Sequence, residues 1–147
     1  MNTIVVGVDG SPGSIAALRA ALAEAQIRGS SVKVVSAWHV PSAAYGSGWV
    51  PMPIDKHDYE QIGEAALEKS LAAVDADKNG VPITSIAREG QAAEVLVTEA
   101  KGAELLVVGS RGLGGFRGLL LGSVSQQCAH HASCPVLIVP SANGAAP

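Results

Sequence analysis

Apolar and polar residues follow two patterns along the chain, and each pattern predicts one kind of element. Short runs rich in apolar and β-branched residues are typical of strands buried in a parallel sheet. Such runs predict strands over residues 3–8, 32–38, 81–87, 104–108 and 135–139. Between them, apolar residues recur every three or four positions, as on one face of an amphipathic helix. These segments predict helices over residues 12–28, 55–78, 91–101 and 123–132.

The regular alternation of strands and helices predicts an α/β fold. We expect an open five-stranded parallel sheet with four helices distributed over its two faces. Ser11 and Pro12 are suited to begin the first helix, and Gly29 is suited to end it. The length predicts one domain over residues 1–140. The small-residue tail, 141–147, is expected to be disordered.

A glycine-rich segment connects the fourth strand to the fourth helix. Six glycines lie from Gly109 to Gly122. Glycine allows positive φ and close approach of the backbone to a ligand, and a helix start offers unpaired N–H groups and a positive dipole end. Ser123 and Ser125 add hydroxyl donors at the same place. We therefore predict an anion site here, and phosphates are the anions we expect.

The spacing of these residues excludes two common phosphate loops and fits a third. A Walker A loop needs a lysine, which is absent here, and Arg117 stands where a dinucleotide fingerprint needs its third glycine. The pattern Gly109-x2-Gly112-x9-Gly122-Ser123 resembles the nucleotide-binding motif of the universal stress protein family. The alternative is a tight, flexible loop without a ligand, which explains less well why two arginines accompany so many glycines.

The resemblance extends from Ile4 to Val139 and implies a particular topology. It implies the strand order 3-2-1-4-5 of the Rossmann-like, adenine nucleotide alpha hydrolase type of fold. In this order the chain reverses its direction of winding between the first and fourth strands. Ligands bind beyond the carboxyl ends of strands at such a point. Asp9 and Gly109 stand at those two ends.

The predicted site combines three strand ends with the glycine-rich segment. Asp9 could accept hydrogen bonds from ribose hydroxyls, and it could also cap the first helix. By resemblance, Ala37 offers backbone groups to adenine, and Gly7 permits close approach. Arg111 and Arg117 could neutralise phosphates or could simply be solvated. The predicted binding residues are Gly7, Asp9, Ala37, Val108, Gly109, Ser110, Arg111, Gly112, Gly115, Arg117, Gly122, Ser123, Val124 and Ser125.

The resemblance implies ATP as the ligand, with AMP or cyclic AMP as alternatives and Mg²⁺ bound through the phosphates. No catalytic constellation accompanies the loop, and only Gln126 and Gln127 could orient an attacking water. We expect a nucleotide-binding regulatory protein of the stress response, at most a slow ATPase. An interaction module with a vestigial loop stays open as an alternative.

Cysteine usage and charge bear on metals and partners. Cys128, His131 and Cys134 could hold zinc, but ordinary buried cysteines are favoured, and no metal site is predicted. The net charge of −3 argues against nucleic acid as the main partner. No apolar stretch approaches the length of a transmembrane helix. A cytoplasmic location is therefore expected.

The last strand and one long loop suggest contacts beyond the core. Pro135–Val139 is wholly apolar and is expected at a sheet edge, where an exposed apolar strand invites pairing. We therefore predict a homodimer, in which by resemblance the two fifth strands meet antiparallel. The loop from His39 to Asp55 contains Tyr45 and Trp49. It could partly cover the ligand or be a disordered insertion.

Overall fold

The structure, a computed structural model, describes residues 2–41, 55–75, 78–110 and 121–140. Within these ranges strands and helices alternate as predicted. The strands are β1 (Thr3–Gly7), β2 (Ser31–Trp38), β3 (Ile83–Glu89), β4 (Leu105–Gly109) and β5 (Val136–Val139). The helices are α1 (Pro12–Arg28), α2 (Lys56–Ala73), α3 (Ala92–Glu99) and α4 (Ser123–His131). The predicted tail and most of the long loop after β2 lie outside the described residues.

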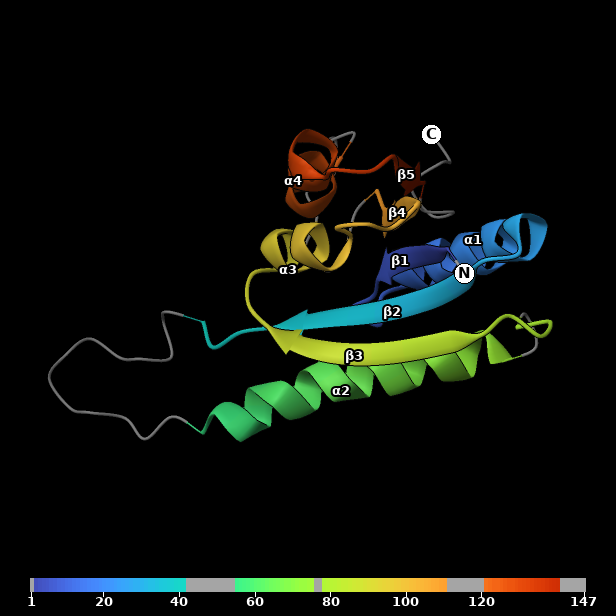
Figure 1. The fold of residues 1–147 in the computed structure, drawn as a ribbon. Coiled ribbons are helices and arrows are strands. Elements are labelled where there is room, and N and C mark those ends of the chain that lie inside the picture. Colours follow the sequence, from blue (N-terminus) through green and yellow to red (C-terminus); the bar gives the residue numbers. More distant parts are fainter. Residues whose placement is uncertain (1, 42–54, 76–77, 111–120, 141–147) are drawn as a thin grey trace, which may run out of the picture.

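The five strands form one parallel sheet in the order β3-β2-β1-β4-β5, which confirms the predicted topology. Figure 1 shows this order from β3 at the bottom to β5 at the top. β1 is central, between β2 and β4, and the winding reverses between β1 and β4. Their carboxyl ends therefore lie next to each other at the topological switch point.

Two apolar clusters hold the helices against the two faces of the sheet. Successive strand residues point to opposite faces, so Ile4 and Val6 pack with α1 and α2, while Val5 packs with α3 and α4. All three side chains are at most 1% exposed. Figure 1 shows α2 beneath β3, with α3 and α4 together on the opposite side of the sheet. Strands buried on both faces explain the continuous apolar runs of the sequence.

The predicted start and end of α1 are confirmed. The Ser11 hydroxyl accepts a hydrogen bond from the Ser14 N–H, 3.2 Å away, and Pro12 is the first helical residue. Gly29 ends the helix with φ of 69°, in the left-handed region where glycine is favoured. The sequence alone therefore located both ends of this helix.

The predicted end of α2 is wrong by several residues. The helix was expected to reach Lys78 but ends at Ala73. Val74 leaves helical geometry with φ of −113° and is completely buried in the core. Asn79 and Gly80 then turn the chain with positive φ, and β3 begins at Ile83 instead of Val81. The helix ends early because burying Val74 and reaching β3 both require the chain to turn.

Candidate functional site

The starts of α1 and α4 lie beyond the carboxyl ends of β1 and β4. At the end of β4, a Cβ atom on Gly109 would lie 2.9 Å from the Gly13 carbonyl oxygen of α1. Such contact is too close for any side chain, so glycine is needed here for backbone packing. Positive φ plays no part, because φ at Gly109 lies outside the left-handed region. The glycine that was expected to admit a ligand admits the backbone of α1.

The start of α1 is closed by its own side chains. Asp9 Oδ1 accepts a hydrogen bond from the Ser11 N–H at 2.9 Å, and the Asp9 N–H donates to Ser14 Oγ at 3.1 Å. The Ser14 hydroxyl donates in turn to the Ser11 carbonyl, also at 3.1 Å. Ser11 and Ser14 are buried, whereas Asp9 is exposed. The turn therefore fixes the Asp9 backbone and one carboxylate oxygen. Asp9 supports the N-cap residue Ser11, and Ser11 itself caps the helix.

The start of α4 is open. Gly122 precedes the helix, and in the described part of the chain no side chain caps its first turn. The first internal bond of the helix runs from the Gln126 N–H to the Gly122 carbonyl at 3.1 Å. The N–H groups of Ser123, Val124 and Ser125 therefore have no acceptor within the helix. Gly122 has φ of −72°, a value open to any residue, so conformational freedom does not require a glycine here.

Ser110 and Gly122, which flank the glycine-rich segment, are joined directly. The Gly122 N–H donates to the Ser110 carbonyl at 2.6 Å. Ser125 is 1% exposed, and its hydroxyl lies 3.1 Å from the same carbonyl. Ser125 was expected to offer its hydroxyl to a ligand, but the structure places that hydroxyl among backbone carbonyls. Nothing in the sequence pattern signalled this contact.

The end of β2 presents backbone groups towards the β1–α1 turn. The Val35 carbonyl accepts from the Val8 N–H of the β1 side, whereas the Trp38 carbonyl accepts from the Gly90 N–H of the β3 side. Because successive residues point to alternate sides, the N–H and C=O of Ala37 point to the β1 side. The pairing with β1 ends at Gly7 and Val35, while β2 continues with β3 to Trp38 and Glu89. Ala37 thus offers an adjacent donor and acceptor beyond the end of the β1 ladder.

Two further glycines make room for large side chains near the site. A Cβ atom on Gly7 would lie 2.6 Å from the Leu96 side chain of α3. On α2, a Cβ atom on Gly63 would lie 3.0 Å from the Trp38 ring. Gly63 was not singled out from the sequence, although a glycine inside a helix often has a packing reason. Both glycines position the strand ends that carry Asp9 and Ala37.

The structure therefore brings most of the described candidate residues to one end of the sheet. Asp9, Gly109, Ser110 and Ser123 follow or end β1 and β4, or begin α4, and Ala37 lies at the end of β2. Val108 is 3% exposed, and Val124 packs beside the cluster under α3 and α4, so their side chains belong to the core. The remaining predicted residues, Arg111, Gly112, Gly115 and Arg117, lie outside the described residues.

Comparison with known proteins identifies the family. The model of the universal stress protein family matches residues 1–140. The chain belongs to the universal stress protein family. A universal stress protein of Mycolicibacterium smegmatis is 36% identical over 140 residues, which cover 92% of this chain and 45% of that protein. The chain thus spans about half the length of that relative.

A relative and a solved structure of similar length agree with this assignment. Universal stress protein YxiE of Bacillus subtilis is 34% identical over 147 residues, covering 94% of this chain and 98% of that protein. The crystal structure of a universal stress protein in complex with cAMP has a TM-score of 0.70 and 26% identity, and the match covers 96% of this chain and 98% of the other. Within the described ranges, no helix combines the length and hydropathy needed to cross a bilayer.

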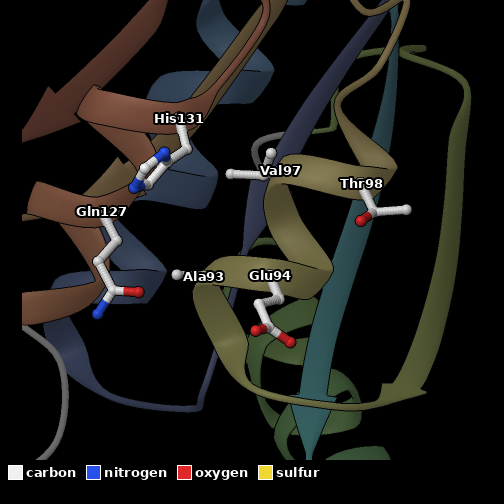
Figure 2. A pocket seen from close by; sticks show the side chains of 6 residues that line it. All are labelled: Ala93, Glu94, Val97, Thr98, Gln127 and His131. Carbon is white, nitrogen blue, oxygen red and sulfur yellow. The ribbon is translucent and has the colours of Figure 1, made fainter.

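The two glutamines considered for water activation have different surroundings. Gln126 Nε2 donates to the Leu121 carbonyl at 3.0 Å. Gln127 lines a cavity of about 320 Å³ between α3 and α4, where it lies across from Ala93 and Glu94 (Figure 2). Both residues are exposed. In this universal stress protein, Gln126 thus reaches back to the residue before the N-cap of α4, whereas Gln127 belongs to the cavity between α3 and α4.

The two cysteines have the environment of core residues. Cys128 is completely buried, and burial raises the pKa of its thiol to about 11. Burial also raises the pKa of Cys134, although a backbone hydrogen bond from Leu106 acts against this rise. Zinc binds thiolates, so a raised pKa opposes metal binding. Among the residues that the structure describes, no group of three His, Cys, Asp or Glu side chains is placed to hold a metal ion.

Proposed function

We propose that this universal stress protein binds an adenine nucleotide at the carboxyl ends of β1, β2 and β4. The observation that carries the proposal is the open start of α4, where the motif residues Gly122 and Ser123 occupy the N-cap and first helical positions. A helix start without a side-chain cap, at the switch point of a parallel sheet, attracts a phosphate. The related protein solved with cAMP supports an adenine nucleotide as the ligand.

Each part of the nucleotide has a proposed partner in the described chain. The N–H groups of the first turn of α4 and the Ser123 hydroxyl would bind phosphate oxygens. The exposed Asp9 carboxylate would accept from ribose hydroxyls. The N–H and C=O of Ala37 would pair with the donor and acceptor edge of adenine. Gly109 and Ser110 would form the floor of the site, and Arg111, Gly112, Gly115 and Arg117 belong to the same proposal.

We propose ATP as the resident nucleotide, with AMP and cyclic AMP as the other candidates. Mg²⁺ would be bound through phosphate oxygens and water. Calorimetric titration with ATP, AMP and cyclic AMP tests the site. Gly122→Val places a branched side chain where the phosphates would approach, and it should abolish binding.

Gln91→Val is the matched control for this experiment. Gln91 is also the N-cap of a helix, α3, and makes no side-chain capping bond. The same valine at that N-cap should leave nucleotide binding unchanged. Unchanged affinity in Gly122→Val would refute the site. If the wild-type protein bound none of the three nucleotides, the vestigial-loop alternative would hold instead.

We propose a regulatory role with slow or absent hydrolysis. Phosphoryl transfer usually needs a group that orients the attacking water. Gln126 Nε2 is instead bonded to the Leu121 carbonyl, and Gln127 lines the cavity between α3 and α4. The test is to purify the protein without added nucleotide, denature it and identify what is released. Bound ATP agrees with a sensor. ADP or AMP, together with phosphate release that Gly122→Val abolishes, would establish a slow ATPase.

We also propose that the protein forms a homodimer through β5. This strand is at the edge of the sheet, and its four residues are half-buried. The carbonyls of Pro135 and Val139 accept from β4, so Val136 and Ile138 point their backbone groups to the open edge. Ile138→Pro removes one outward N–H and is compatible with an edge strand. Sedimentation should give a dimer for the wild type and a monomer for the variant. A wild-type monomer at micromolar concentration would contradict the proposal.

A further inference from the structure

The Ser125 hydroxyl has two acceptors inside the protein. It lies 3.1 Å from the Ser110 carbonyl oxygen and 3.0 Å from the Gly122 carbonyl oxygen. The residue is 1% exposed. A serine hydroxyl has a single proton. That proton is shared between these two carbonyls, so none is left for a ligand phosphate.

These two carbonyls belong to the residues that flank the glycine-rich segment. The Ser110 carbonyl also accepts the Gly122 N–H at 2.6 Å, and the Ser110 N–H donates to the Val139 carbonyl of β5 at 2.8 Å. The Gly122 carbonyl also accepts the Gln126 N–H at 3.1 Å. One hydroxyl therefore joins the end of β4, the N-cap of α4 and the first turn of that helix. We call the three residues Ser110, Gly122 and Ser125 the clasp.

We propose that Ser125 is a positioning residue for phosphate binding and does not itself contact the ligand. It acts through Ser110 and Gly122, whose positions set the direction of the open N–H groups at the start of α4. Ser123, in contrast to the buried Ser125, is exposed and stands at the first helical position. This inference rests on the proposed nucleotide site and assigns different roles to two serines that the motif presents alike.

Removing the Ser125 hydroxyl should loosen the clasp without unfolding the protein. Each carbonyl keeps a backbone donor, because Ser110 retains the Gly122 N–H and Gly122 retains the Gln126 N–H. No buried carbonyl is left without a partner, which is the costly outcome in such deletions. The loss is one of preorganisation, and a ligand must then order the first turn as it binds. The affinity for a nucleotide with a phosphate group should therefore fall more than the affinity for the nucleoside.

The first measurement is amide hydrogen exchange at Gly122 in nucleotide-free protein. Ser125→Ala should accelerate this exchange by about tenfold, because the N–H then opens more often. Ser123→Ala should leave it unchanged. Ser125→Thr should also leave it unchanged, since a threonine hydroxyl in a helix can bond a carbonyl three residues earlier, which here is that of Gly122. If Ser125→Ala does not fold, Ser125→Cys, with similar volume and a weaker donor, takes its place.

The second measurement compares the affinities for AMP and adenosine. Ser125→Ala should lower the affinity for AMP by about fivefold and should change the affinity for adenosine by less than about twofold. Ser125→Thr should restore the affinity for AMP. Unchanged exchange at Gly122 together with weakened AMP binding would make Ser125 a direct ligand and overturn the inference. Unchanged exchange and unchanged affinity would overturn it too. Failure of the wild type to bind nucleotide would refute the proposed function, whereas the exchange result would still decide whether the clasp holds Gly122.

Discussion

α1 and α4 begin at neighbouring strand ends, but they differ in whether side chains bond to the N–H groups of the first turn. Ser11, Asp9 and Ser14 bond to one another and to the first turn of α1, so that start is closed. Gly122 has no side chain, and no described side chain replaces it at α4. The residue at the N-cap thus decides whether the N-cap side chain itself satisfies the first N–H groups of a helix.

The other two helices support this distinction. Asp55 closes α2 by accepting from the His57 N–H at 2.9 Å. α3 has no capping side chain, but Glu94 stands in its first turn, where a carboxylate complements the helix dipole. Of the four described helices, α4 alone has neither a side-chain cap nor an acidic residue in the first turn. An anion at the start of α4 would therefore complement a helix dipole that no described cap or acidic residue complements.

Closing the start of α4 should have the largest effect on binding. Gly122→Asp provides a carboxylate that can accept the N–H groups of the first turn, and the φ of −72° suits it. AMP affinity should fall by about 100-fold or more, because the carboxylate occupies and repels the phosphate position. Stability in urea should stay equal or rise. Calorimetry that found AMP binding retained would contradict the comparison.

Disturbing the contact between the two starts should have the next largest effect. Gly109→Ala places a methyl group 2.9 Å from the Gly13 carbonyl, so α1 must shift, at a cost of about 2–3 kcal/mol. Gly102→Ala is the comparator: nothing lies within 4 Å, and its φ of 81° alone should cost about 1 kcal/mol. Urea unfolding of both variants measures the difference. Equal decreases in the free energy of unfolding of the two variants would show that the contact between Gly109 and Gly13 is not tight.

Opening the start of α1 should affect stability and leave binding intact. Ser11→Ala removes the side-chain cap at 3.2 Å from the Ser14 N–H and should cost about 1 kcal/mol. The Asp9 carboxylate still accepts the Ser11 backbone N–H, so AMP affinity should stay within about twofold. Thermal unfolding and calorimetry on the same preparation separate the two quantities. A large loss of AMP affinity would place Ser11 in the site.

Removing one hydroxyl from the open start should have the smallest effect. Ser123 is exposed, so Ser123→Ala should leave stability unchanged. AMP affinity should fall by about threefold, as for one lost hydrogen bond. Ser133→Ala, at an exposed serine beyond α4, serves as the control. Identical AMP affinity in both variants would remove Ser123 from the phosphate site.

The sequence predicted the elements well because their signals are local. Apolar runs identified all five described strands, and Ser11 and Gly29 identified the ends of α1. The strand order came from family resemblance, since no local pattern states which strands pair. The end of α2 was misjudged because the apolar helical period continues through Val74, which is buried but already lies outside helical geometry. A local pattern could not show where the chain leaves the helix to reach β3.

The described candidate residues lie at the predicted end of the sheet, and several of them also make packing contacts that the sequence did not indicate. Gly7 and Gly109 were assigned to the ligand, whereas in the structure they admit Leu96 and the backbone of α1. The Ser125 hydroxyl lies against the carbonyl of a residue fifteen positions earlier. These roles depend on contacts between distant parts of the chain. A sequence motif gives the spacing of residues and cannot show such contacts.

The burial of Cys128 has a consequence for oxidative chemistry. A thiol pKa of about 11 leaves roughly one molecule in ten thousand as thiolate at pH 7, and peroxides and alkylating reagents react with the thiolate. The side chain is also shielded completely from solvent. We therefore expect Cys128 to react slowly with oxidants and thiol probes in the folded protein, so that its labelling requires opening of the structure around it.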